Sequence, residues 1–439
     1  MIANIIFILV FLAALYFFYR SFSVIISNIK LGRDLDIKDN KNKRWKTMFL
    51  VAIGQSKMTK RPIAGVLHIM VYVGFIIVNV EMLEILIDGI TGSHRVLSFL
   101  PFYNGLVSTL EFFALAVITA CIFFLIRRNV IKVKRFHNQE MTKWPTLDAN
   151  IILFTEIVLM TAFLSMNAAD QVLQSLGNHH YVETGSFLFS SLLVPMFSNF
   201  SEGTLIFIER FGWWFHIIGV LAFLNYIPYS KHFHVFFAFP NVYFSKLKAR
   251  TYISNMESVT NEVKIAMGII EDPGASDEDI ATFGAKDVQD LNWKSLMDAY
   301  TCTECGRCTA VCPANLTGKK LSPRKIVMDT RDRLEVVGKE IRKNGKDHVD
   351  GKSLFKDYIS AEEIWACTTC NACTYECPVN IDQVSIIMEL RRYVFMEESA
   401  APSPLNAMST NIENNGAPWQ YSAADRYNWA EELYINEEN

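Results

Sequence analysis

Five long apolar stretches dominate the first 240 residues of the chain. A transmembrane helix needs about 20 predominantly apolar residues. The stretches that meet this requirement are residues 2–29, 62–90, 105–126, 149–172 and 204–229. The first stretch is too long for a signal-peptide core and no small-residue cleavage site follows it, so we interpret it as a retained anchor. The pattern therefore predicts an all-α chain in which a five-helix transmembrane bundle precedes a soluble domain.

The polar connections between these stretches differ strongly in positive charge. Residues 30–61 contain ten Lys or Arg and residues 127–143 contain six, whereas residues 91–104 contain one and residues 173–203 contain none. Because cytoplasmic loops are enriched in Lys and Arg, the first two connections are expected in the cytoplasm. The amino terminus is then expected outside, and everything after Ser230 inside.

The overall composition fits a membrane protein and argues against a nucleic-acid partner. Hydrophobic residues make up 51% of the chain and charged residues 20%, whereas a globular domain averages about 25% charged residues. The formal net charge of -3 provides no basic field for nucleic acid. The last 190 residues have soluble-protein composition and hold eight of the nine cysteines.

Two cysteine runs in the soluble part have the spacing of iron–sulfur ligands. Each reads C-x2-C-x2-C-x3-C-P, over residues 302–313 and 367–378. In this pattern three closely spaced thiolates hold one [4Fe-4S] cube and the fourth ligates the other cube. Cluster 1 is thus assigned Cys302, Cys305, Cys308 and Cys377, and cluster 2 is assigned Cys367, Cys370, Cys373 and Cys312. Zinc held by C-x2-C pairs is the alternative, but two complete runs followed by proline favour iron–sulfur clusters in a reducing cytoplasm.

Three histidines in or beside the apolar stretches are candidate cofactor ligands, namely His68, His216 and His234. Intramembrane ionisable residues are functional candidates by default, although a histidine can also make an interhelical hydrogen bond. If the fifth helix keeps its register past Pro228, His216 and His234 lie five turns apart on one face, about 27 Å from each other. His232 then falls on the opposite face. Such histidines suit the axial ligands of two haems, or of one haem beside a quinone site.

The residues around these histidines resemble a known cytochrome. Residues 213–234, which begin WWFH and end IPYSKHFH, look like the fifth helix of the respiratory nitrate reductase gamma-type cytochrome b subunit. Residues 61–68 resemble its second helix. The resemblance implies that His68 and His234 hold an inner b-type haem. It also implies an outer haem held by His216 and a second-helix histidine.

The outer half of the predicted bundle departs from that pattern, because Val78 stands where the second-helix histidine is expected. One interpretation is a single haem, with His216 free to bind a quinone. The other is an outer haem held by His216 and the thioether of Met82 or Met166. Charged candidates for quinone binding or proton transfer at this depth are Glu81, Glu84 and Arg210, with interhelical pairing or an interfacial position as the alternative.

The soluble domain resembles the helical ferredoxins. The 54 residues between the cysteine runs include helix-like segments at 323–333 and 334–344. Ser360 and Glu363 predict a capping box that opens a helix leading into Cys367. Residues 290–395 resemble the iron–sulfur subunits of succinate dehydrogenase, anaerobic glycerol-3-phosphate dehydrogenase and heterodisulfide reductase, which implies an α-helical ferredoxin domain with two [4Fe-4S] clusters.

The combination resembles membrane iron–sulfur oxidoreductases of the heterodisulfide reductase and electron-transfer-flavoprotein:menaquinone oxidoreductase type. This implies an electron-transfer subunit that links a cytoplasmic flavoprotein donor to membrane quinone, expected to be menaquinone, through both clusters and b-type haem. Longer relatives carry CCG repeats; this sequence has no Cys-Cys pair, so we expect a separate CCG-type iron–sulfur subunit. Alternatives are the anchor of a heterodisulfide or 2-hydroxy-acid (glycolate or lactate) oxidoreductase, and a redox-sensing membrane protein, which the histidines disfavour.

The expected domain organisation follows from these features. Residues 1–235 form a cytochrome b-like transmembrane domain, 236–290 a linker or cap, 291–400 the ferredoxin-type domain, and 401–439 an acidic tail with aromatic residues that docks on a partner or stays free. The expected location is the bacterial inner (cytoplasmic) membrane. Basic residues expected to form a solvated face or to meet an acidic partner are Arg307, Lys319, Lys320, Arg324 and Lys325.

Overall fold

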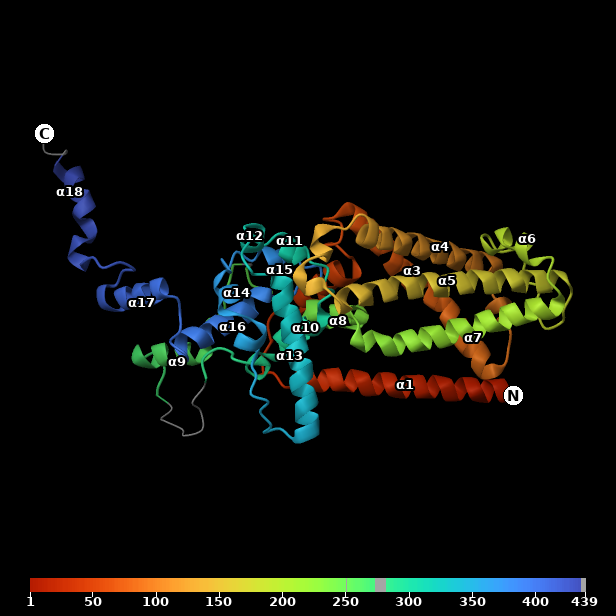
Figure 1. Ribbon diagram of the computed structural model, residues 1–439, viewed down its shortest axis with the longest axis horizontal. Coiled ribbons are helices and arrows are strands. Elements are labelled where there is room, and N and C mark those ends of the chain that lie inside the picture. The colour runs from red at the N-terminus through yellow and green to blue at the C-terminus, as the bar shows by residue number, and fades with distance from the viewer. Residues whose placement is uncertain (250, 273–281, 436–439) are drawn as a thin grey trace.

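The protein is elongated and entirely helical in architecture, with the membrane-length helices at one end (Figure 1). The computed structural model describes residues 1–249, 251–272 and 282–435. Five long helices run side by side: α1 (Ile2–Ile29), α3 (Pro62–Thr91), α4 (Tyr103–Leu125), α5 (Trp144–Ser175) and α7 (Glu202–Tyr226). All five are long and apolar enough to cross a membrane. The predicted five-helix bundle is confirmed, and each predicted span coincides with one of these helices.

Local sequence signals account for where the long helices begin and end. Pro62 opens α3 at a position where its missing N–H is not needed, and Gly92 closes this helix in the left-handed conformation at φ +82°. The side chain of Ser201 caps α7 by accepting a hydrogen bond from the backbone N–H of Thr204. The amino terminus lies at the end of the bundle that faces away from the soluble domain (Figure 1).

The fifth long helix does not continue to His234, and the expectation of an unbroken register is wrong. Helix α7 ends at Tyr226, and two short 3-10 turns, Ile227–Tyr229 and Lys231–Phe233, precede α8 (His234–Tyr243). Ser230 between the turns has extended backbone angles, φ -119° and ψ 153°. The proline ring at position 228 is incompatible with the helix interior, so the chain turns here instead of kinking.

The soluble domain contains seven helices among its described residues and no β-strand. They are α10 (Trp293–Thr301), α11 (Arg307–Ala310), α12 (Pro313–Leu316), α13 (Pro323–Asn344), α14 (Ala361–Trp365), α15 (Ala372–Glu376) and α16 (Gln383–Met396). The capping box predicted for Ser360 and Glu363 is confirmed at the start of α14. The two segments predicted at 323–333 and 334–344 form the single helix α13.

One apolar core joins the soluble domain to the end of the bundle. It contains Ile25 and Ile29 from α1, Phe233 beside α8, and Leu296 and Ile387 from the soluble domain. Hydrogen bonds cross the same boundary. Asn28 at the end of α1 donates to the Tyr300 hydroxyl at 2.8 Å, and Asn241 of α8 donates to the Val379 carbonyl at 2.9 Å. The two parts are therefore in fixed contact.

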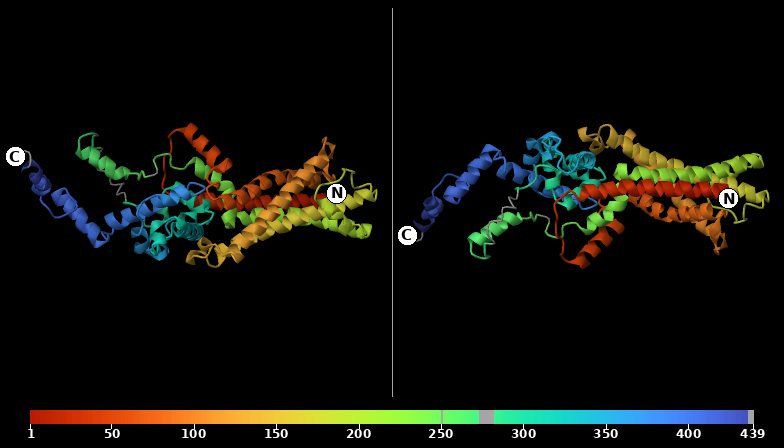
Figure 2. Two further views of the ribbon diagram at one scale, coloured as in Figure 1. Left: turned by 90° about the horizontal axis from the view of Figure 1, so that it is seen from above. Right: turned by 90° about the horizontal axis from the view of Figure 1, so that it is seen from below.

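Shorter elements surround this framework. Helices α2 (Lys41–Met48) and α8 lie at the end of the bundle next to the soluble domain, and α6 (Val194–Phe197) lies at the far end of the bundle (Figure 1). Helix α9 (Glu257–Ala266) belongs to the segment expected as linker or cap, of which residues 250 and 273–281 lie outside the described residues. Helices α17 (Ser403–Asn415) and α18 (Asn428–Ile435) extend away from the molecule, as both views in Figure 2 show. Their docking stays a prediction.

Candidate functional site

Four cysteines from three segments line one cavity in the soluble domain. Cys302 follows α10, Cys305 lies in the loop, Cys308 lies on α11, and Cys377 follows α15. Gly306 adopts the left-handed conformation at φ +69°, which turns the chain sharply between Cys305 and Cys308. The cavity thus brings together the three closely spaced cysteines of the first run and the last cysteine of the second run.

The other four cysteines lie together beside this cavity. Cys312 is close enough to Cys370 to interact with it electrostatically, and Cys373 is close enough to both Cys367 and Cys312. Cys308 and Cys373 pack in one small apolar cluster, so the two sites are neighbours. Cys370 is exposed, whereas Cys302, Cys308 and Cys377 are buried. The second site therefore lies nearer to solvent than the first.

The surroundings of the thiols suit an iron–sulfur cluster. Burial raises the pKa of Cys302 and of Cys377 to about 12. Thiolates are the ligating form, so the positive charge of bound iron would have to offset this burial. The backbone N–H groups of Thr369 and Ile381 lie 3.4 and 3.3 Å from the sulfurs of Cys367 and Cys377. Such hydrogen bonds stabilise sulfur-borne negative charge.

A mononuclear zinc site does not fit the same cysteines. Zinc needs about four ligands at about 2.3 Å from one point. Among the described residues, no three His, Cys, Asp or Glu side chains are arranged to hold a single metal ion. A four-iron cube is larger than one ion, and four cysteines spread around a cavity fit it better.

His68 and His234 face each other at the end of the bundle beneath the soluble domain. Their ring centroids are 6.4 Å apart, and the rings are inclined by 44°. The Nδ1 atom of His234 lies 3.0 Å from the Lys231 carbonyl oxygen. If Nδ1 carries the proton, this hydrogen bond leaves the opposite ring nitrogen with a free lone pair. The side chain of His68 is partly buried, and its Nδ1 atom is shielded from solvent without a partner among the described residues.

The separation of these rings fits one metal between them. Imidazole nitrogen binds metals such as zinc at about 2.0–2.1 Å. Two such bonds, plus about 1 Å from each nitrogen to its ring centre, give about 6 Å between centroids. The observed 6.4 Å therefore fits an iron held axially by both rings.

His232 lies on the same side as this pair, which corrects the expectation that it falls on the opposite face. Its ring is 5.5 Å from that of His234 and 5.4 Å from that of Phe223. The 3-10 turn at Lys231–Phe233 changes the angle per residue, so the helical register used for the prediction does not apply. His232 is therefore packed beside the pair, between α7 and α8.

His216 is fully buried in the middle of α7. Its Nδ1 atom lies 3.1 Å from the Leu159 carbonyl oxygen of α5, and its Nε2 atom has no partner among the described residues. The ring packs against Phe163 at a centroid distance of 6.1 Å. Val78, where an outer ligand would stand, is buried in the same apolar core as Met82 and Met166. The environment thus offers one oriented histidine nitrogen among apolar groups.

The three charged candidates in the outer half do not form one cluster of bonded groups. Glu84 accepts hydrogen bonds from the Tyr103 hydroxyl at 2.7 Å and from the Leu97 N–H at 2.9 Å. Glu81 is buried, and one of its carboxylate oxygens has no partner among the described residues. Arg210 pairs with its neighbour Glu209. Glu84 therefore binds the loop between α3 and α4. Glu81 is the carboxylate with an oxygen still free to accept a hydrogen bond among the described residues.

Sequence reasoning missed a buried ion pair at the outer end of the bundle. Arg95 binds Asp170 at 2.5 Å and Asn167 at 2.8 Å, and both carboxylate oxygens of Asp88 accept from backbone N–H groups of the loop. Glu111 is fully buried and accepts from Asn167 at 2.9 Å. The available signal was that Arg95 is the one Lys or Arg in the two outer connections.

The expected solvated face holds for only two of the five basic residues, because Lys319 and Lys320 are exposed. Arg324 is fully buried and pairs with Glu140 of the bundle connection at 2.7 Å. Arg307 is buried and donates to the Lys57 carbonyl at 2.9 Å, whereas Lys325 pairs with Asp329 within α13 at 2.6 Å. The contacts of Arg324 and Arg307 tie the cluster 1 region to the bundle. Arg307 is also close enough to His68 to act on it electrostatically.

Two cysteine sites on a five-helix anchor define the class of protein as a membrane-anchored iron–sulfur protein. Residues 301–381 match the family described as 4Fe-4S dicluster domain. Over 98% of its length the chain is 29% identical to the probable iron-sulfur-binding oxidoreductase FadF of Bacillus subtilis, and over 89% it is 26% identical to the EtfAB:quinone oxidoreductase of Syntrophomonas wolfei. A probable membrane-anchored ferredoxin of Chromohalobacter salexigens is 33% identical over 36% of this chain and 25% of its own.

The chain spans only part of its longer relatives. It covers 61% of the length of the Bacillus protein and 54% of the length of the Syntrophomonas protein. No solved structure matches the chain. The comparisons agree with iron–sulfur chemistry on a membrane anchor.

Proposed function

We propose that the chain is the membrane-anchored electron-transfer subunit of a quinone-linked iron–sulfur oxidoreductase. Its two [4Fe-4S] clusters and one b-type haem would supply one-electron transfer between a soluble donor and the membrane quinone. The name of the Syntrophomonas relative, EtfAB:quinone oxidoreductase, supports a flavoprotein donor and a quinone acceptor, for which we favour menaquinone. We further propose a CCG-type iron–sulfur subunit as the intermediate partner.

The order of the sites supports this role. Cys370 lies at the exposed side of the soluble domain, and the buried first cysteine site lies next to it. Lys57, in the connection that precedes α3, donates to the Cys377 carbonyl at 3.0 Å. Arg307 connects the same region to the surroundings of His68. The residues thus form a continuous series from solvent to the bundle, and the cysteine side is expected to face the cytoplasm of a bacterial cell.

The observation that carries the haem is the 6.4 Å separation of the His68 and His234 rings. Apolar packing alone gives no reason for two partly buried imidazoles to lie this close, with the Nδ1 atom of His68 shielded and unpaired among the described residues. In our proposal His68 and His234 are the axial ligands, and the Lys231 carbonyl orients the His234 ring.

The outer half is proposed as the quinone site, with His216 as its polar contact. If Nδ1 of His216 donates to the Leu159 carbonyl, Nε2 can only accept a hydrogen bond in the neutral ring. Nε2 therefore suits the hydroxyl of a quinol, whereas a quinone carbonyl would need a protonated ring. Glu81 is the proposed proton carrier, because Glu84 and Arg210 have partners within the protein.

The test replaces each inner histidine by alanine and measures haem content of the purified protein. His68→Ala and His234→Ala should each abolish the low-spin haem absorbance, because each removes one axial ligand. His232→Ala is the matched control. The His232 ring lies 5.5 Å from the His234 ring, but our proposal gives it no role as a ligand, so this variant should keep its haem. Reoxidation of the dithionite-reduced protein by a soluble menaquinone analogue should slow in the first two variants only. Full haem in both would overturn the proposal.

A further inference from the structure

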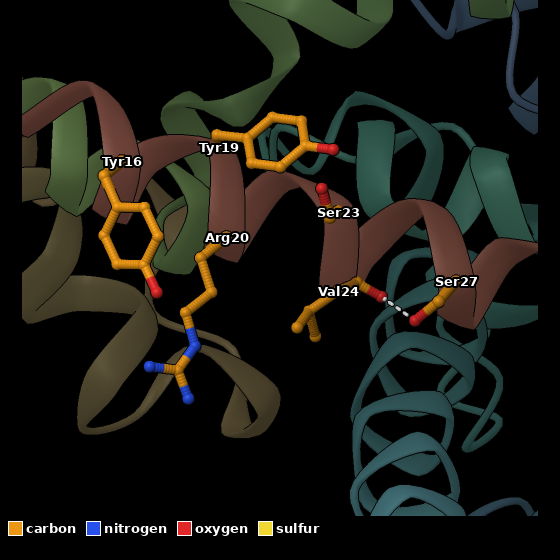
Figure 3. A pocket seen from close by; sticks show the side chains of 6 residues that line it. All are labelled: Tyr16, Tyr19, Arg20, Ser23, Val24 and Ser27. Atoms are coloured by element: carbon orange, nitrogen blue, oxygen red, sulfur yellow. Dashed lines mark hydrogen bonds between the residues drawn. The ribbon is translucent and has the colours of Figure 1, made fainter.

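One face of α1 is polar at the end that meets the soluble domain, although the rest of the helix is apolar. Tyr16, Tyr19, Arg20, Ser23 and Ser27 recur along this end at helical spacing, and together with Val24 they line a groove (Figure 3). Tyr16 and Tyr19 are 60% and 71% exposed. In the most apolar stretch of α1 only 6% of the residues are buried, so this helix is open to lipid along most of its length.

Helix α13 crosses the end of α1 and projects past it (Figure 1). Gly338 and Arg342 of α13 contact Asn28, and the Arg342 guanidinium donates to the Asn28 side-chain oxygen at 2.5 Å. From this contact α13 runs on to Asn344, beyond the side of the bundle (Figure 1). In Figure 3 the Arg20 side chain points to the same side of α1 as the projecting helix. We call this region, where α13 leaves α1 beside the groove, the corner; the residues that line the groove itself all belong to α1.

The corner lies at the depth of the lipid headgroups. Helix α1 has 28 residues, which makes it about 42 Å long at 1.5 Å per residue. A bilayer is about 40–45 Å thick with its headgroups. The last two turns of α1 and the projecting part of α13 therefore lie among the headgroups. Arg20 lies about half a turn deeper than these two turns, where a long side chain reaches up to the headgroup level.

The charges of the corner are complementary to an anion. Arg20 has no hydrogen bond or ion pair within the described part of the chain. The projecting end of α13 carries Lys339, Arg342 and Lys343. The acids on this end are Glu335 and Glu340, and Glu340 already accepts from Asn344 at 2.6 Å. Arginine beside tyrosine at the interface suits a phosphate whose acyl chains lie along α1.

From these observations we infer that the corner between α1 and α13 is a binding site for the headgroup of an anionic phospholipid. Arg20 contacts the phosphate, Lys339 and Lys343 of α13 add positive charge beside it, and the tyrosines lie beside the glycerol region. The site is independent of the haem and quinone proposed above, and it would fix the soluble domain to the membrane surface beside α1.

The test titrates the purified full chain, in uncharged detergent, with dioleoyl phosphatidylglycerol and follows the midpoint of thermal unfolding. The midpoint should rise saturably with this lipid and not with dioleoyl phosphatidylcholine. Arg20→Gln should weaken half-saturation about fivefold, since a basic residue at an anionic surface contributes about 1 kcal/mol. Lys339→Gln combined with Lys343→Gln should weaken it further. Arg20→Lys should retain most of the effect.

The control is Lys264→Gln, which removes an exposed cation from α9, far from the bundle (Figure 1). Cluster absorbance verifies that each variant is folded. Equal lipid binding by Arg20→Gln and the unsubstituted protein would overturn the inference. So would the same protection by glycerol phosphate, which indicates a free-phosphate site, or a lipid-free dimer that Arg20→Gln dissociates, which indicates a second copy as the occupant.

Discussion

Cys377 is the residue on which the partition of the two clusters depends. It follows α15 within the second run, yet it lines the cavity of Cys302, Cys305 and Cys308. The sequence predicted this exchange because the spacing of the two runs encodes it directly. The ligand exchange can be predicted from the spacing of the cysteines alone, without information on tertiary packing.

Replacing Cys377 by serine should therefore perturb the same electron paramagnetic resonance signal as Cys305→Ser. Both changes remove a ligand of the cluster that the first run holds. Cys312→Ser is the matched comparison, because it should perturb the signal that Cys370→Ser perturbs. Signals that pair Cys377 with Cys370 instead would contradict the exchange.

His216→Ala distinguishes the two interpretations of the outer half. With His216 in the quinone site and one haem in the protein, the substitution should leave haem content unchanged and slow quinone reduction at least tenfold, about 1.4 kcal/mol, because it removes the Nε2 acceptor that would hold the quinol formed. Redox titration of the haem absorbance is the measurement. Two haem transitions, one lost in His216→Ala, would instead indicate an outer haem with Met82 or Met166 as its second ligand.

The end of α7 shows which features of an element the sequence could not predict. Asp148 of α5 accepts hydrogen bonds from the Ser230 hydroxyl at 2.7 Å and from the Lys231 N–H at 3.0 Å. This carboxylate, about 80 residues away in the chain, holds the turns after Tyr226. Periodicity reports only local spacing, so it located His234 at the right depth but placed His232 on the wrong face. Pro228 was the one sequence feature that indicated the end of the helix here.

The contact of α1 with α13 is closely packed at one glycine. A Cβ atom at Gly338 would lie 2.0 Å from the Asn28 side-chain oxygen. This side chain is held at both ends, because its nitrogen donates to the Tyr300 hydroxyl and its oxygen accepts from Arg342. Gly338→Ala should therefore lower the midpoint of thermal unfolding, with a cost of about 1–3 kcal/mol for overpacking.

Gly105→Ala is the control for that substitution. Gly105 lies in α4, and a Cβ atom there would have nothing within 4 Å. Alanine in a helix is favoured over glycine by about 0.5–1 kcal/mol, so this variant should be neutral or slightly more stable. A Gly338→Ala protein as stable as the Gly105→Ala protein would show that the two helices do not pack as described.

Considered as a whole, the molecule exposes its two cluster sites unequally. Cys370 is exposed and Cys367 partly exposed, whereas Cys302, Cys308 and Cys377 are buried. Anaerobically prepared protein treated with ferricyanide should therefore lose the signal of the second cluster before that of the first. The signals are assigned with the serine variants above. Loss in the reverse order would place the first site at the surface.

The sequence predicted both parts of the molecule but not how they join. Long apolar stretches and cysteine spacing are local signals, and the five helices and the dicluster domain followed from them. The joint depends on pairs such as Lys231 with Glu304 and Arg324 with Glu140, which lie far apart in the chain. No local pattern distinguishes such buried cations from solvated ones, which is why Arg324 was expected at the surface.

The contacts of Asn28 also determine when, during synthesis, the end of α1 can complete its packing. Its partners Tyr300 and Arg342 follow it by 272 and 314 residues. Ribosomes add about 5–20 residues per second, so about 15 to 60 seconds separate the emergence of this asparagine from that of its partners. The first helix enters the bilayer early, but the Asn28 side chain at its inner end stays without these partners until residue 342 of the 439 has been made. The start of the chain therefore waits for a segment of the soluble domain before its contacts are complete.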